Sequence, residues 1–305
     1  MSQAANKKKK RLGREELTLN LMILPGMIIL IIFVFAPLVG SLMAFENYVP
    51  AKGLLKSKWV GLSNFQFIFS LPDSKQVFMN TLIIAFSKLV VNIFVPVTFA
   101  ILLNEIRVNV CKKIFQTVVY LPHFLSWVVL ATVVTNMFSL DGPINAVISA
   151  FGGNPIYFLA DNKWFRTVIV GTDVWKEFGY NSVVYLAALT GIDPGLFEDA
   201  SIDGANRFKQ ILNITVPALL PTVVLMTALN LGNILNAGFD QVFNLYNPIV
   251  YETGDIIDTY VYRIGMVERQ YSIGTAVGLL KSVISFVLIL SANKLAQKTT
   301  GSGIF

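Results

Sequence analysis

The sequence has little of what metal, redox and hydrolytic chemistry need. Its one cysteine, Cys111, cannot form a disulfide within the chain, and its one histidine, His123, cannot build a histidine-rich metal site. The phosphate-binding pattern GxxxxGK[ST] and the nucleophile pattern GxSxG are both absent. We therefore expect no metal site, no bound cofactor, no ATPase and no recognisable hydrolase in this chain.

Charge is also scarce. Only 14% of the 305 residues are charged, against about 25% in soluble proteins, whereas 54% are hydrophobic. The hydrophobic residues gather into blocks long enough to cross a hydrocarbon core of about 30 Å. The composition predicts an all-α polytopic membrane protein and makes a soluble globule a poor alternative.

The hydrophobic blocks predict the domain organisation. Three windows are uncharged, while the second contains Lys88, the sixth contains Lys281, and the fourth contains Asp173, Lys176 and Glu177. We predict one six-span domain over residues 18–298, between a tail at 1–17 and a tail at 299–305. The predicted transmembrane helices are 18–45, 78–104, 114–140, 164–190, 211–239 and 271–293.

Basic residues predict the orientation. The tail at 1–17 is rich in Lys and Arg and directly precedes the first apolar block, which favours an anchor beside anionic lipid over a nucleic-acid-binding arm. With this tail inside, 13 Lys and Arg lie in inner segments and 8 in outer segments. We therefore expect both termini in the cytoplasm, although the lysine-rich first outer loop argues mildly against this.

The inner loop between the fourth and fifth spans has the composition of two short helices. Phe197, Ala200, Ser201 and Gly204 recur at helical spacing and would form a face of mostly small residues that another backbone can approach. Gly204 suits a tight turn between the helices, because glycine alone enters left-handed conformations cheaply. A surface helix pair that only closes the bundle is the alternative.

The same loop carries a family resemblance. The pattern Glu198-x-Ala200-xx-Asp203-Gly204-Ala205, followed by Ile214-xx-Pro217, resembles the EAA loop of permease subunits in ATP-binding-cassette importers, at residues 196–217. In that family, coupling helices of this loop dock on the ATPase subunits. The resemblance implies ATPase coupling for Glu198, Ala200, Asp203, Gly204, Ala205 and Pro217. Asp199 departs from the family, which often has alanine there.

Further motifs extend the resemblance over nearly the whole chain, to binding-protein-dependent carbohydrate permeases of the maltose-type superfamily. The branch most like it imports oligosaccharides derived from polysaccharides. The motifs are 60–65, 80–81, 103–105, 121–127, 141–145 and 258–263. The resemblance implies a type I importer fold in a bacterial cytoplasmic membrane and a transport subunit that is not an enzyme. It also implies a second permease subunit, two ATPase subunits that use ATP and Mg²⁺, and an extracellular or periplasmic solute-binding protein.

Polar residues inside the predicted spans are candidates for the substrate path, because ionisable groups in a membrane usually face a bundle interior or a wet cavity. The candidates are Lys88, Trp175, Lys176, Tyr180, Asn181, Tyr185, Asn230 and Asn233. Hydrogen bonding between helices is an equal alternative for the asparagines, including Asn92 and Asn236. Lysines in the path would suit a uronic acid. Lys281 is also a candidate for contact with the partner permease, and His123 is expected to pack rather than relay protons.

The favoured function is one permease half of an ATP-driven oligosaccharide importer. An ion-coupled secondary sugar transporter is the runner-up, but it would normally show inverted repeats, and no repeat stands out. A membrane-embedded enzyme would need clustered catalytic residues, and the sequence shows none.

Overall fold

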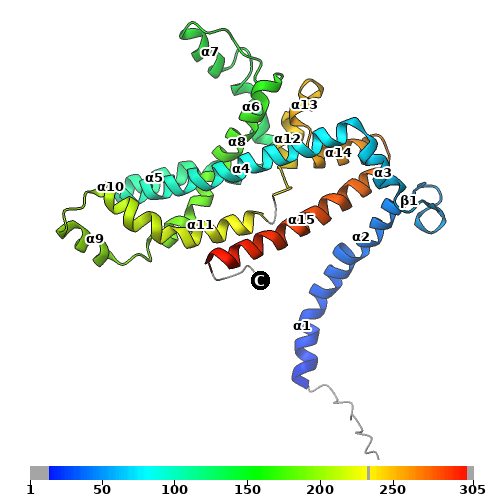
Figure 1. Cartoon of the computed structure of the whole chain (residues 1–305), viewed down its shortest axis with the longest axis horizontal. Helices are drawn as coiled ribbons and strands as arrows, with labels where there is room; N and C mark the ends of the chain where they lie inside the picture. The colour runs from blue at the N-terminus through cyan, green and yellow to red at the C-terminus, as the bar shows by residue number, and fades with distance from the viewer. Residues whose placement is uncertain (1–13, 232–233, 301–305) are drawn as a thin grey trace, which may run out of the picture.

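The chain is a bundle of long and short helices (Figure 1). The computed structural model describes residues 14–231 and 234–300. In this part of the chain the only strands are β1 (Glu46–Asn47) and β2 (Lys58–Trp59), an antiparallel pair with Glu46 opposite Trp59. The prediction of an all-α membrane protein is confirmed.

The helices fall into long elements of the bundle and short connecting elements. The first apolar segment consists of α1 (Arg14–Leu30), η1 (Ile31–Phe35), α2 (Ala36–Leu38) and η2 (Val39–Phe45). The other long or apolar elements are α4 (Pro72–Glu105), α5 (Asn109–Tyr120), α6 (Trp127–Met137), α8 (Asn162–Leu189), α11 (Val216–Leu231) and α15 (Tyr271–Thr300). The short elements are η3 (Leu54–Lys56), α3 (Ser63–Ser70), η4 (Leu121–Phe124), α7 (Pro143–Ala150), α9 (Pro194–Ile202), α10 (Arg207–Gln210), η5 (Ile211–Thr215), α12 (Phe239–Leu245), η6 (Pro248–Val250), α13 (Tyr251–Gly254), α14 (Ile257–Tyr262) and η7 (Arg263–Val267).

Four described helical segments are long and apolar enough to cross a membrane, and they match the first, second, fifth and sixth predicted spans. They are Thr18–Phe45, Pro72–Glu105, Arg207–Leu231 and Tyr271–Ser291. The fourth predicted span corresponds to α8, whose central charges make it less apolar than the others. It lies inside the bundle and packs along α4 over much of its length.

The third predicted span, 114–140, is not one straight helix. Asn109–Phe124 and Trp127–Met137 are both helical but meet at an angle of 106°. Pro122 supplies no backbone N–H, and the chain leaves α5 through the 3₁₀ turn η4. Ser126 then starts α6 by accepting a hydrogen bond from the backbone N–H of Val129. The run of uncharged residues concealed this break.

The fifth predicted span, 211–239, also differs from the structure. Its first residues form the π-helical segment η5, and the described helix ends at Leu231. The chain then runs irregularly over 234–238, and Gly238, with φ of +93°, precedes α12. A left-handed backbone costs little energy only for glycine, so Gly238 in the sequence permits this break between α11 and α12.

The two tails fall partly outside the described residues. Of the predicted tail 1–17, residues 1–13 are not described, and α1 already begins at Arg14. Of the predicted tail 299–305, residues 299–300 belong to α15 and 301–305 are not described.

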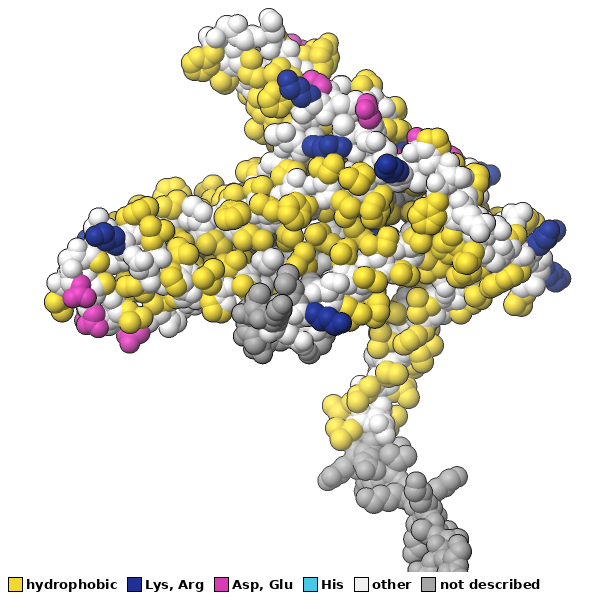
Figure 2. All heavy atoms as spheres, viewed as in Figure 1, with side chains coloured by type: hydrophobic (Ala, Val, Ile, Leu, Met, Phe, Trp, Pro, Cys, Tyr) yellow, Lys and Arg dark blue, Asp and Glu magenta, His cyan; other side chains and the backbone are white. Residues whose placement is uncertain are grey.

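The core lies where α4, α6, α8 and α12 meet, around fully buried Ile84, Phe165, Ile169 and Val242. By contrast, α1 and α2 project away from the bundle (Figure 1), and the apolar window of this segment buries none of its residues. Hydrophobic side chains cover most of the long helices in Figure 2, which suits surfaces that face lipid or a partner subunit.

A polar cluster inside the bundle and a groove at its end

Lys88 of α4 is the centre of a buried polar cluster. Its Nζ lies 2.9 Å from Asp173 Oδ1 on α8 and donates a hydrogen bond of 2.8 Å to the carbonyl oxygen of Ala237. A third hydrogen bond goes to Gln241 Oε1. All three ammonium donors are therefore used. Gly238 is needed here for its left-handed backbone and also because a Cβ atom would collide with Lys88 Nζ.

Gln241 completes this cluster from α12. Its side chain is fully buried, and its Nε2 donates to the carbonyl oxygen of Ile169 at 2.7 Å and to Thr172 Oγ1 at 2.8 Å. Every polar atom of the amide is satisfied, so Gln241 links α12 to both α4 and α8. Sequence reasoning missed Gln241, because it lies just beyond the predicted fifth span.

Next to Lys88 is a polar cavity of about 210 Å³, formed by α4, α8 and the irregular segment after α11. Asn92 Nδ2 donates to Asp173 Oδ2 at 3.0 Å, while Asn92 Oδ1 is buried and has no hydrogen-bond partner among the described residues. The polar side chains lining the cavity are Lys88, Asn92, Asp173, Glu177, Asn181, Asn230 and Asn236. The predicted asparagines of three separate segments thus converge on one space.

A second polar cluster lies at the break in the third span. Lys176 Nζ donates to the carbonyl oxygen of His123 at 2.6 Å and lies 3.3 Å from Glu177 Oε1. Glu177 Oε2 is 2.7 Å from His123 Nδ1. The ring of Tyr180 stacks on His123 with centroids 3.9 Å apart. These contacts hold the chain at Pro122–Phe124 against α8, and His123 packs there as predicted.

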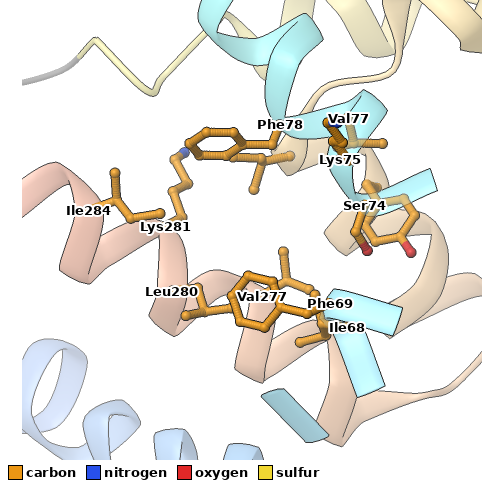
Figure 3. Close-up of a pocket in the computed structure, with 12 residues that line it drawn as sticks. Ile68, Phe69, Ser74, Lys75, Val77, Phe78, Val277, Leu280, Lys281 and Ile284 are labelled. Carbon is orange, nitrogen blue, oxygen red and sulfur yellow. The ribbon is translucent and has the colours of Figure 1, made fainter. Parts of the chain in front are cut away.

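Lys281 of α15 pairs with Asp258 of α14, with its Nζ 2.6 Å from Oδ1, and also donates to Asn236 Oδ1 at 2.7 Å. Figure 3 shows Lys281 on the α15 wall of an apolar cavity of about 390 Å³, opposite Phe78 and Val77 of α4. Each of the three lysines predicted inside the spans is therefore paired with a carboxylate of the same chain. Lys281 has partners within this chain and needs none from a second permease.

Four of the predicted path residues do not line the polar cavity: Lys176 and Tyr180 belong to the second cluster, and Trp175 and Tyr185 lie elsewhere. Trp175 faces a separate apolar cavity together with Val134 and Phe158. Tyr185 is 2% exposed and packs in an apolar cluster with Ala100 and Leu219, so it does not line the polar cavity. Asn233 lies outside the described residues.

The loop after α8 forms two short helices, as its composition predicts. Asp193 caps α9 by accepting from Gly195 N at 2.9 Å, and Gly204, with φ of +77°, makes the turn. The N–H of Ala205 then donates to the carbonyl oxygen of Ala200 at 2.8 Å. Buried Gln210 joins the helices by donating to Ser201 Oγ at 2.9 Å. The turn at Gly204 and the hydrogen bonds of Gln210 thus hold α9 and α10 together.

Between α9 and α10 lies an open groove of about 620 Å³, lined by Phe197, Glu198, Ser201, Ile202, Ala205, Arg207 and Gln210. Ile202 is 84% exposed and Phe208 is 68% exposed, although both are large hydrophobic residues in a short polar loop. Figure 2 shows acidic side chains gathered at this end of the molecule. The motif did not reveal Ile202 and Phe208, but apolar residues in an otherwise polar loop were a signal.

A bundle of apolar helices with a polar cavity inside and a grooved loop at one end defines a multi-pass membrane protein built for transport. Residues 93–301 match the family described as "Binding-protein-dependent transport system inner membrane component". The chain belongs to this family. The resemblance derived from the sequence is thereby confirmed, and the chain is a transport permease subunit.

Curated relatives and solved structures agree with this assignment. The chain is 40% identical over 288 residues to the polygalacturonan/rhamnogalacturonan transport system permease protein YteP of Bacillus subtilis (strain 168), covering 94% of this chain and 90% of the relative. It is 41% identical to Protein LplB of the same organism, over 94% of this chain and 91% of the relative. A solved bacterial alginate ABC transporter, in complex with an alginate pentasaccharide-bound periplasmic protein, superposes with a TM-score of 0.87 at 36% identity, covering 95% and 98% of the two chains.

Proposed function

We propose that the chain is one permease half of an ATP-driven importer for acidic oligosaccharides released from polysaccharides. The names of the relatives support the substrate class, since polygalacturonan and alginate are both polymers of uronic acids. The observation that carries the proposal is the polar cavity inside an otherwise apolar bundle.

The cavity would bind sugar through neutral groups. All three donors of Lys88 are already used by the protein, so a free lysine for a uronate is not available there. Asn181 and Asn230 instead present amide groups that can donate to a carboxylate and also exchange hydrogen bonds with hydroxyl groups. Asn92 Oδ1, a buried acceptor without a partner among the described residues, suits a sugar hydroxyl donor. This replaces the hypothesis that lysines bind the uronic acid.

The groove of α9 and α10 is proposed to receive a partner ATPase on the cytoplasmic side. Ile202 and Phe208 are exposed apolar residues of the kind that anchor an interface, with Glu198 and Arg207 beside them. Arg207 Nε lies 3.7 Å from Glu105 Oε2, so movement of this loop acts directly on the end of α4. The complete importer is proposed to contain a second permease subunit, two ATPase subunits that consume ATP with Mg²⁺, and an external solute-binding protein, with both termini of this chain in the cytoplasm.

The proposal is tested with the assembled complex in lipid vesicles. We expect ATP hydrolysis to rise when the binding protein loaded with an oligogalacturonide or alginate oligosaccharide is added, and labelled sugar to enter only when ATP reaches the ATPase side. Equal uptake of neutral oligosaccharides would remove the acidic class but keep the importer. Uptake by this chain alone, driven by an ion gradient, would support a secondary transporter, which the family assignment does not favour.

A further inference from the structure

Five aromatic rings of α12, α13 and α14 form a connected series, which we call the aromatic track. Phe239 stacks on Phe243 with centroids 5.2 Å apart, and Phe243 meets Tyr262 edge to face at 4.9 Å. The series continues from Phe243 to Tyr246 at 6.2 Å and from Tyr246 to Tyr251 at 5.1 Å. Phe239 and Phe243 share one face of α12, because they are four residues apart, and Tyr246 directly follows the helix.

The aromatic track starts one residue after the lining of the polar cavity. Gly238, which lines that cavity, is the residue directly before Phe239. The other end lies beside α4 near its first turns, where Asn80 Nδ2 donates to the carbonyl oxygen of Glu252 at 3.1 Å. The groove loop contacts the opposite end of α4 at Glu105, about 38 Å away along the helix axis. The track therefore connects the cavity with the end of the bundle that is remote from the groove.

Two features distinguish the track from ordinary core packing. Phe243 is 37% exposed and Tyr262 is 38% exposed, so ring surface remains open within this chain. The last ring is held in place, since the guanidinium of Arg263 lies 4.4 Å from the centroid of Tyr251 and pairs with buried Asp255. Burial, together with the neighbouring Tyr251, raises the pKa of Tyr246 to about 12.

We propose that the aromatic track is a sugar-stacking surface that leads the oligosaccharide from the outer mouth of the permease to the polar cavity. Sugar rings have apolar C–H faces and polar edges, and a row of aromatic faces flanked by tyrosine hydroxyls matches both. Successive rings share the binding of successive sugar units, so a chain can advance without leaving the surface. The inference rests on the proposed function, because it requires the cavity to be the sugar conduit.

The test is a double variant that combines Phe243→Leu with Tyr262→Leu in the complete importer. Leucine keeps the apolar bulk but removes the flat face. We expect uptake of a pentasaccharide to fall about tenfold, because two stacking faces are lost, and uptake of a disaccharide to fall less. Phe243→Trp combined with Tyr262→Leu should restore pentasaccharide uptake, because tryptophan again supplies a flat face. The matched control is Phe286→Leu on α15, where the phenylalanine is 61% exposed outside the track and should have no effect.

The outcomes separate this inference from the proposed function. A double variant that assembles and takes up the pentasaccharide like the control overturns the aromatic track. Loss of copurification with the second permease also overturns it, because the rings would then be a subunit interface. If the unaltered importer assembles but moves no oligosaccharide of any length, the proposed function itself fails.

Discussion

Lys88 shows how a single charged residue is made tolerable inside an apolar bundle. Its side chain is 9% exposed, and its ammonium group donates to oxygen atoms of Asp173, Ala237 and Gln241. A buried charge that loses its partner is strongly destabilising, whereas removing both charges together costs much less. The sequence predicted that Lys88 lies in the bundle but not that its charge is neutralised, because Asp173 lies on a distant helix and Gln241 beyond the predicted span.

This pairing can be measured by a double-mutant cycle. Lys88→Met alone should destabilise the subunit by about 3 kcal/mol, since it leaves Asp173, which is 17% exposed, with only Asn92 as a partner. Lys88→Met combined with Asp173→Leu should be closer to the unaltered protein. Thermal unfolding of the purified complex in detergent gives both values. Additive losses would show that the two residues do not interact.

The polar cavity gives a second prediction at this scale. Asn181→Ala and Asn230→Ala should each lower uptake about tenfold by removing a hydrogen bond to sugar, without changing assembly or the ATPase rate in the absence of binding protein. Asn213→Ala is a control, because Asn213 donates only to the carbonyl oxygen of Lys209 near the groove loop. Unchanged uptake in both cavity variants would indicate that these asparagines only join helices.

At the scale of elements, the geometry of the bundle depends on how closely neighbouring helices approach each other and on where helices are broken. The hydropathy of the chain was enough to locate most spans, and the spacing of small residues predicted the helix pair α9 and α10. Hydropathy could not reveal the break at Pro122 or the irregular backbone over 234–238, because both lie in uncharged sequence and their backbone carbonyl groups are bound by Lys176 and Lys88. Local propensity is overridden where a tertiary contact satisfies the freed backbone.

Gly179 lets α8 approach α5, since a Cβ atom there would collide with the carbonyl oxygen of Val119. Gly179→Val should therefore destabilise the subunit by about 1–3 kcal/mol through overpacking. Gly171→Val on the same helix is the matched control, because a Cβ atom at Gly171 meets nothing within 4 Å. Equal melting temperatures of the two variants would contradict the close approach.

Gly204 controls the shape of the groove. Its φ of +77° strains any β-branched residue, although a Cβ atom would have open space around it. Gly204→Val should abolish copurification of the ATPase while the chain still inserts into the membrane. Gly204→Asn should retain part of the association, since asparagine tolerates the left-handed region. Normal transport by the valine variant would show that the groove does not dock the ATPase.

At the scale of the whole molecule, parts of the chain project from the bundle and expose apolar side chains that lipid or a partner subunit can cover. Residues 18–38 project from the bundle, whereas η2 packs against α15, and the chain turns through 106° at the start of α6 into an arm that ends in α7 (Figure 1). Exposed side chains such as Met22, Phe33 and Phe151 lie on these projections. The family resemblance predicted a partner permease, but the composition did not reveal which parts project.

The single cysteine allows the orientation of the whole chain to be tested. Cys111 is exposed at the start of α5, on the side predicted to be cytoplasmic. In intact cells a membrane-impermeant maleimide should leave it unlabelled and should react only after permeabilisation. With Cys111→Ser as background, Lys56→Cys should react in intact cells. Labelling of Cys111 from outside would invert the predicted topology.

The pairing of Lys88, Lys176 and Lys281 with carboxylates has an electrical consequence. One unpaired charge moving through 100 mV would change the energy of the transition by about 2.3 kcal/mol. Because these pairs cancel, the three lysines and their partners add no net charge to the apolar bundle, and the membrane voltage exerts no net force on them.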